Sequence, residues 1–142
     1  MSGWRIVPVV ATFLLIGHKG ESHWPLVLSQ ALAPLGNLEI ASEEEMDERF
    51  QNQYEAIIID AGAVNEVPSL VSHLRVRCPE TPIVVATASP TWQRAREAYQ
   101  AGATDYIRKT MDQEELYAIL ADILSRALLP GQERRSERTA ST

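Results

Sequence analysis

Glu55-Ala56-Ile57-Ile58-Ile59-Asp60 is a run whose four apolar residues lead directly into a carboxylate. Short unbroken apolar runs of this kind are typical of strands that are buried on both faces of a parallel sheet. Two more such runs are Thr12–Ile16, which is followed by Gly17, and Pro82–Thr87, which ends in a threonine. The three runs together predict the central strands of a parallel sheet, with Asp60 at the carboxyl end of one of them.

Between these runs, apolar residues recur at i, i+3 and i+4, which is the spacing of amphipathic helices. The expected apolar helix faces are Trp24–Leu35, Met46 with Phe50, Val67–Leu74, Trp92 with Ala95 and Tyr99, and Leu116–Ala127. Gly36 stops the first helix, a Ser42-x-x-Glu45 capping box precedes the second, and Asp112 with Glu115 caps the fifth. The fourth begins with Ser89 as N-cap and Pro90 at the first helical position. Two shorter strands are expected at Leu38–Ala41 and Thr104–Arg108.

Strand and helix therefore alternate along the whole chain, which predicts a parallel sheet with right-handed helical crossovers on both faces. The expected fold class is α/β: a three-layer, doubly wound, flavodoxin-like domain with five parallel strands in the order 2-1-3-4-5. We place this domain at residues 12–128, behind an N-terminal extension at 1–11. Residues 129–142 are expected to form a disordered tail or linker stub, because after Pro130 they hold no apolar residue larger than alanine.

The composition fits one globular domain of 142 residues, with 45% hydrophobic and 23% charged residues. A formal net charge of −6 argues against nucleic-acid binding by phosphate neutralisation. The apolar stretch Ile6–Ile16 is shorter than the roughly 20 residues that a membrane-spanning helix needs. Cys78 is the single cysteine, so the chain needs no oxidising compartment for an internal disulfide. We therefore expect a cytoplasmic protein with no nucleic-acid partner and no membrane contact.

Polar residues follow several predicted strands, and ligands of open α/β sheets bind at the carboxyl ends of the strands. Gly17-His18, Asp60, Thr87 and Lys109 occupy these positions. A carboxylate can act as an acyl-phosphate nucleophile, while a hydroxyl and an ammonium can hold phosphoryl oxygens. Each residue also has a purely structural interpretation: a loop cap for Asp60, a strand-end residue for Thr87 and a surface lysine for Lys109. In the same way, Tyr106 can be read as a half-buried strand aromatic.

The segment from Tyr54 to Leu124 resembles the receiver domain of two-component response regulators, the CheY-like fold. The residues that carry the resemblance are Ile57-Ile58-Ile59-Asp60, Pro82-Ile83-Val84-Val85-Ala86-Thr87-Ala88, Ala101-Gly102-Ala103-Thr104-Asp105-Tyr106-Ile107-Arg108-Lys109 and Glu114-Glu115-Leu116. The resemblance implies that Asp60 is the phosphoacceptor and that Thr87 is the hydroxyl residue that turns toward the phosphoryl group. It implies that Lys109 pairs with that group and that Tyr106 is the switch aromatic.

Members of this family accept phosphate from a sensor histidine kinase, with Mg²⁺ as the cofactor. They signal through the face of the fourth helix, fifth strand and fifth helix, so the resemblance also implies a homodimer through that face. The family places two acidic residues after the first strand, but this chain reads Ile16-Gly17-His18-Lys19 there. Mg²⁺ prefers oxygen ligands, whereas glycine offers no side-chain donor and histidine offers a softer nitrogen. We therefore expect a degenerate metal site at Gly17 and His18 and a weakened Mg²⁺ affinity, with no cofactor assigned.

Three functions follow from these observations. The first is an atypical receiver, a signalling and interaction module whose Asp60 phosphorylation is weak, metal-independent or absent, with His18 and Lys19 as candidates to mimic the cation. The second is a conventional phosphorelay receiver whose metal ligands come from an unexpected position such as Glu21. The third is a flavodoxin-like nucleotide- or flavin-binding protein, although Gly17–Ser22 matches neither glycine-rich phosphate-binding pattern. No acid–base pair, metal cluster or nucleophile elbow is evident in the sequence, so we do not expect an enzyme.

Overall fold

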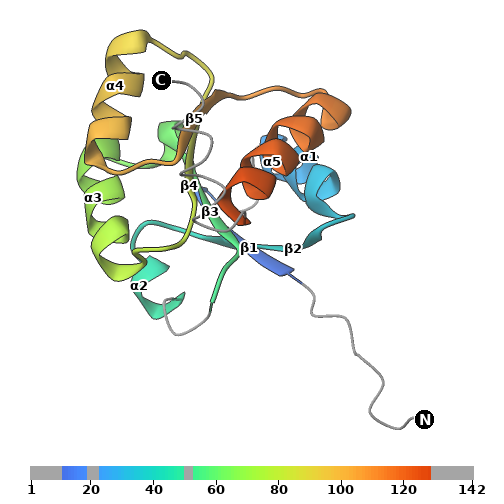
Figure 1. Cartoon of the computed structure of the whole chain (residues 1–142), viewed down its shortest axis with the longest axis horizontal. Coiled ribbons are helices and arrows are strands. Elements are labelled where there is room, and N and C mark those ends of the chain that lie inside the picture. The colour runs from blue at the N-terminus through green and yellow to red at the C-terminus, as the bar shows by residue number, and fades with distance from the viewer. Residues whose placement is uncertain (1–10, 19–22, 50–52, 129–142) are drawn as a thin grey trace, which may run out of the picture.

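A parallel sheet forms the centre of the computed structural model, which describes residues 11–18, 23–49 and 53–128, with side chains through residue 126 (Figure 1). Its five strands follow the order β2-β1-β3-β4-β5, as the sequence predicted. The strands are β1 (Ala11–Ile16), β2 (Gly36–Ala41), β3 (Ala56–Asp60), β4 (Ile83–Thr87) and β5 (Asp105–Arg108). Every pair of neighbours is parallel.

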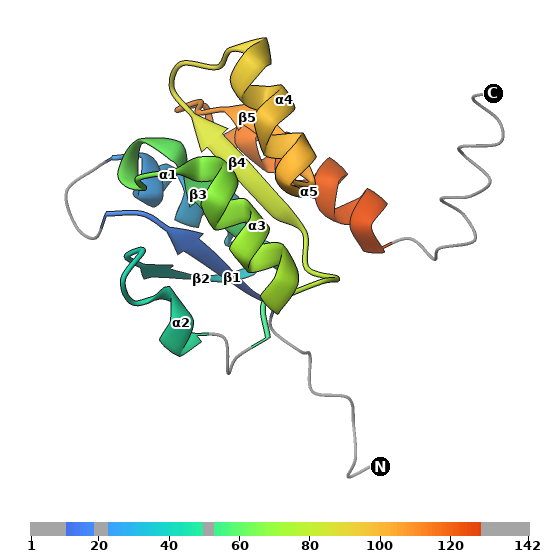
Figure 2. The same ribbon diagram turned by 90° about the vertical axis from the view of Figure 1, so that its left-hand side faces the viewer.

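Helices cover both faces of this sheet (Figures 1 and 2). They are α1 (Trp24–Leu32), α2 (Met46–Arg49), α3 (Val67–Arg77), α4 (Trp92–Ala101) and α5 (Gln113–Leu128), with a single 3-10 turn, η1 (Ala61–Ala63), after β3. Helices α1 and α5 lie on one face, and α2, α3 and α4 lie on the other. The predicted three-layer, doubly wound α/β fold is therefore confirmed. None of the described helices is long and apolar enough to cross a membrane.

The isoleucine run of β3 explains why both faces must be covered. Ile58 packs into the apolar core beneath α1 and α5, whereas Ile57 and Ile59 pack into the core beneath α3. All three side chains are at most 1% exposed. Because side chains alternate across a strand, an unbroken apolar run can be buried only between two layers of helices.

The strand register brings the carboxyl ends of β1, β3, β4 and β5 to one edge of the sheet. Ile16 pairs with Ile59, so Gly17 follows β1 beside the end of β3. Asp60 pairs with Ala86, one residue before the end of β4. This edge therefore collects the polar residues that follow the separate apolar runs of the sequence.

Two predicted helix boundaries are wrong. Helix α4 begins at Trp92, because the N-cap is Thr91, whose Oγ1 accepts a hydrogen bond from Arg94 N at 3.1 Å. The expected N-cap, Ser89, instead donates its backbone N–H to Thr87 Oγ1 at 3.2 Å and so belongs to the turn after β4. The expected apolar face of this helix is also wrong: Trp92 and Tyr99 are 75% and 46% exposed, and the buried residue of α4 is Ala98.

Gly36 also plays a different part from the expected helix stop. Helix α1 ends at Leu32, and Gly36 begins β2, where it pairs with Ala11 of β1. A Cβ atom at position 36 would lie 2.1 Å from the carbonyl oxygen of Ala11. The glycine therefore permits close approach of two backbones, which is a second common use of this residue. Phe50, expected in the second helix, lies outside the described residues.

Arg75 of α3 forms hydrogen bonds at the opposite edge of the sheet, where β4 and β5 begin. Its Nε and Nη2 donate to the carbonyl oxygen of Gly102 at 3.0 and 2.8 Å, and Nη2 also donates to Thr104 Oγ1 at 3.2 Å. Its Nη1 donates to the carbonyl oxygens of Cys78, Pro79 and Thr81. One guanidinium thus ties the α3–β4 connection to the α4–β5 connection, where Gly102 ends α4 with φ of 119°.

We predict that Arg75→Lys lowers the free energy of unfolding by about 2 kcal/mol, because an ammonium cannot reproduce the planar fork of donors. Urea denaturation followed by circular dichroism measures this change. Arg96→Lys, at an exposed position of α4, serves as the matched control and should leave the unfolding midpoint unchanged. Equal effects of the two substitutions would contradict the role assigned to Arg75.

Candidate functional site

Asp60 is the last residue of β3 and is only 5% exposed. Its Oδ1 accepts a hydrogen bond from the backbone N–H of Gly62 at 3.0 Å, so the side chain caps the η1 turn. The same oxygen forms an ion pair with Lys109 Nζ at 2.6 Å. Asp60 therefore both caps the η1 turn and forms an ion pair with a lysine.

Lys109 directly follows β5, the strand that lies two places from β3 in the sheet. Its backbone N–H donates to the carbonyl oxygen of Thr87 at 2.8 Å, which anchors the residue beside the end of β4. Its side chain is 20% exposed and extends past β4 to the carboxylate. A nearly buried carboxylate costs several kcal/mol to desolvate unless it is paired, and the short Nζ–Oδ1 distance gives Asp60 that pairing.

Thr87 and Tyr106 lie near this pair without contacting Asp60 through any described hydrogen bond. Thr87 is 7% exposed, and its Oγ1 is engaged by the backbone N–H of Ser89 at 3.2 Å. Tyr106 is half-buried and packs into the core on the α3 and α4 face, the side of the sheet opposite to α1 and α5. The structure thus brings Asp60, Lys109 and Thr87 together at the carboxyl edge of the sheet and places Tyr106 on the α4 side of this edge.

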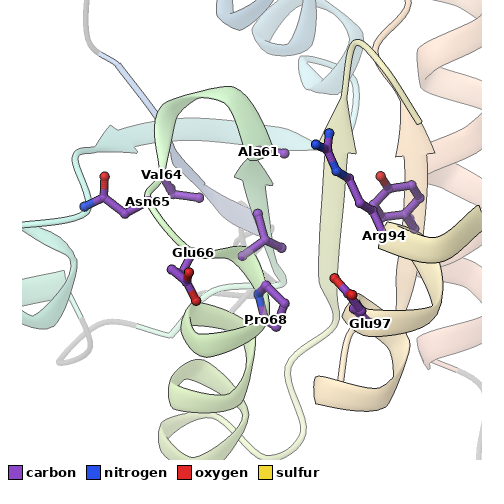
Figure 3. Close-up of a pocket in the computed structure, with 9 residues that line it drawn as sticks. Ala61, Val64, Asn65, Glu66, Pro68, Arg94 and Glu97 are labelled. Atoms are coloured by element: carbon purple, nitrogen blue, oxygen red, sulfur yellow. The ribbon is translucent and has the colours of Figure 1, made fainter. Parts of the chain in front are cut away.

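A cavity of about 380 Å³ lies beside Tyr106 (Figure 3). Glu66 and Pro68 border it from the start of α3, while Arg94 and Glu97 project from α4 on the other side. The Arg94 side chain extends toward Ala61, the residue after Asp60. Movement of Tyr106 would therefore change a surface hollow that reaches from α4 to the neighbourhood of Asp60.

Trp24 is the residue of this site that the sequence analysis missed. It was expected only as part of the apolar face of a helix, and it is indeed 3% exposed. Its ring, however, lies under Lys109, with Nζ 5.4 Å from the ring centroid, and its Nε1 donates to the carbonyl oxygen of Thr110 at 3.1 Å. The spacing of apolar residues carries no information about a contact between segments so far apart in the chain.

The described residues around Asp60 do not fit a magnesium site. Gly17 has no side chain, yet a Cβ built there would lie 3.3 Å from Asp60 Cβ and 3.7 Å from Asp60 Oδ2, so this position faces the carboxylate. His18 is exposed and offers only nitrogen. Within residues 11–18, 23–49 and 53–128, no group of three or more His, Cys, Asp or Glu side chains is placed to hold a metal ion. Lys19 and Glu21 lie outside these ranges.

The comparison that decides the family is a match between residues 41–121 and the family model of the response regulator receiver domain. This chain belongs to the receiver domain family. It is the receiver domain of a two-component response regulator, and the doubly wound fold with Asp60 at the end of β3 agrees with that membership. The predicted family is thereby confirmed. A search of curated proteins found no match.

Solved response regulators share the fold of this receiver. A response regulator from Thermotoga maritima has a TM-score of 0.72 at 23% identity, covering 82% of this chain and 99% of that one. An orphan response regulator of H. pylori, HP1043, has a TM-score of 0.70 at 20% identity, covering 80% and 96%. The chemotaxis response regulator CheY4 of Vibrio cholerae has a TM-score of 0.69 at 21% identity, covering 81% and 99%.

We predict an asymmetry between the two halves of the ion pair. Lys109→Met should lower the free energy of unfolding by about 2–3 kcal/mol, because it leaves the nearly buried Asp60 carboxylate without its cation. Asp60→Asn should cost about 1 kcal/mol or less, because the amide oxygen can still accept from Gly62 and the partly exposed ammonium can turn to water.

Chemical denaturation of the two single variants and of the double variant measures this asymmetry. The double variant should be more stable than Lys109→Met alone, since removing the carboxylate charge relieves the unpaired state. Strictly additive losses would show that the two side chains do not interact in solution.

Proposed function

We propose that this receiver is an atypical member of its family, a signalling and protein-interaction module in which phosphorylation of Asp60 is weak, metal-independent or absent. The proposal rests on which group is paired with the Asp60 carboxylate. Lys109 Nζ lies 2.6 Å from Asp60 Oδ1, while the position that faces the carboxylate from β1 is Gly17. The ammonium is thus the cation that balances Asp60 among the described residues.

Charge decides how such a site would react. Phosphoryl transfer develops negative charge on several oxygens, and divalent cations normally offset it. Lys109 carries one positive charge, and Asp60 already neutralises it. An incoming phosphoryl group must therefore compete with the carboxylate for the same ammonium. This competition supports slow phosphorylation without a metal, and we assign Asp60 as the acceptor position, with Thr87 and Lys109 as the residues that would hold phosphoryl oxygens.

We assign output to protein contact through the α4, β5 and α5 face, with Thr87 and Tyr106 as the bistable element. Tyr99 Oη donates to Asp105 Oδ1 at 2.7 Å, and Arg126 of α5 pairs with Asp105 Oδ2 at 3.3 Å. Burial and then the hydrogen bond to Asp105 raise the pKa of Tyr99, which favours the protonated hydroxyl that donates to Asp105. Since Asp105 Oδ1 also accepts from Tyr106 N at 2.8 Å, this network joins all three elements next to the proposed switch.

The partners that fit this proposal are a sensor histidine kinase or another signalling protein, and a second copy of the chain on the α4, β5 and α5 face. Trp92 of α4 is 75% exposed, which supports a contact surface at the start of that helix. A conventional receiver with a metal ligand from Glu21 is the competing function. It is tested by the same experiment.

The test of the proposed function is phosphorylation by acetyl phosphate, read by intact mass for wild type and Asp60→Asn. We expect slow or no addition of a phosphoryl group to wild type, at a rate that millimolar Mg²⁺ does not change, and none to Asp60→Asn. Phosphorylation that depends on Asp60 and accelerates at least about tenfold with Mg²⁺ would favour the conventional receiver. Glu21→Gln would then show whether Glu21 supplies the ligand.

We also predict that restoring the acidic pair restores a metal response. In Gly17→Asp/His18→Asp, the Cβ at position 17 would lie 3.7 Å from Asp60 Oδ2, so we expect like-charge repulsion between the two carboxylates to lower stability until a divalent cation binds. Saturating Mg²⁺ should then raise the melting temperature by about 5 °C or more.

Gly17→Ser/His18→Asn is the neutral control, with side chains of similar size but no added charge. The control and the wild type should show no melting-temperature change with Mg²⁺. A similar increase in wild type would contradict the proposal that its own metal site is degenerate.

A further inference from the structure

Trp24 contacts two consecutive residues of the β5–α5 connection. Its indole ring lies under the ammonium of Lys109, and its Nε1 donates to the carbonyl oxygen of Thr110. Trp24 itself belongs to the first turn of α1, on the core face that α1 shares with α5. One side chain from the start of α1 thus touches both the charged group and the backbone of the segment that faces Asp60.

Burial makes both contacts significant. The Trp24 residue is 3% exposed, so the cation lies over a ring that is largely removed from water, where cation–π attraction is strongest. A buried indole N–H must also find an acceptor, and the Thr110 carbonyl supplies one at 3.1 Å. The first contact acts on the lysine head group, and the second fixes the chain next to it.

Hydrogen bonds of Thr110, the next residue, also stabilise the turn that carries Lys109. Thr110 Oγ1 donates to Glu115 Oε1 at 2.7 Å and accepts from Asp112 N at 3.1 Å. The Thr110 side chain is therefore hydrogen-bonded to residues at the start of α5, while its carbonyl oxygen accepts from Trp24.

A lysine needs such support more than a rigid donor would. Its ammonium sits on a flexible four-carbon stem, and holding that stem in one conformation costs conformational entropy. Asp60 attracts the ammonium from one side, and the Trp24 ring lies within cation–π distance of it. These two neighbours together define one position for a charge that would otherwise move with the stem.

We propose that Trp24 is the positioning residue of Lys109: its ring holds the ammonium against Asp60, and its N–H fixes the Thr110 backbone beside it. Trp24 thereby keeps the Lys109 ammonium at the Asp60 carboxylate. The consequence for phosphoryl transfer rests on the proposed function, but the contact itself does not. Freeing Lys109 from Trp24 should loosen the ammonium whether or not Asp60 accepts a phosphoryl group.

The chain offers a clean probe, because Lys19 and Lys109 are its two lysines. Reductive methylation with formaldehyde and cyanoborohydride, followed by peptide mass spectrometry, gives the rate at each amine. We expect Trp24→Leu to raise the rate at Lys109, relative to Lys19, about five- to tenfold, from the loss of a desolvated cation–π contact. Trp24→Phe keeps an aromatic face and should raise it less than about threefold.

Two control variants separate positioning from general loosening of α1. Leu28→Ala removes a fully buried side chain from the same helix and the same core, with no described contact to Lys109. Trp92→Leu removes an exposed tryptophan from α4. Neither should change the Lys109 rate by more than about twofold once the fraction unfolded is matched by denaturant. An equal increase in Leu28→Ala would overturn the proposal.

Wild-type protein provides a test that does not depend on the folding of any variant. After ¹³C-methylation, the methyl resonance of Lys109 should shift upfield because it lies over the indole ring, and it should return to the Lys19 position in denaturant. A Lys109 resonance without a ring-current shift in the native protein would overturn the proposal. Mg²⁺-dependent phosphorylation together with a shifted resonance would defeat the proposed function but leave Trp24 as the positioning residue.

Discussion

The ion pair between Lys109 Nζ and Asp60 Oδ1 organises the carboxyl edge of the sheet. A carboxylate at the end of a strand with helices on both faces has little access to water, so its charge must be balanced within the protein. Residues outside the strand provide that balance: Lys109 with its ammonium and Gly62 with its backbone N–H. We propose that the identity of this balancing charge separates the present site from one built around a divalent cation.

The fold could be predicted almost completely from the sequence, because its strongest determinants are local and physical. Unbroken apolar runs such as that ending at Asp60 permit only a sheet buried on both faces, and the alternation with helices then limits the topology. The errors arose where one residue type serves two purposes. Gly36 can stop a helix or allow two strands to approach, and Ser89 can cap a helix or complete a turn; only the neighbouring strand and Thr91 decide between these uses.

The site was predictable only in part. Positions after predicted strands identified Asp60, Thr87 and Lys109 as residues that lie close together, because parallel strands end at a common edge. The sequence could not show that Trp24 lies beneath the lysine, since that contact depends on how α1 packs beside the β5–α5 connection. It also could not show that Tyr106 borders a cavity shared with α4. Both features come from packing between segments distant in the chain, for which residue spacing gives no signal.

The central claim is that a lysine supplies the charge that a divalent cation supplies in a receiver with the acidic pair. A crystal structure of the wild-type protein grown in millimolar MnCl₂ tests it most directly, because manganese can stand in for magnesium and gives an anomalous signal. The account predicts Lys109 Nζ within hydrogen-bond distance of Asp60 and no anomalous peak beside the carboxylate. A manganese ion bound to Asp60, with Lys109 displaced and a ligand drawn from Glu21, would contradict it.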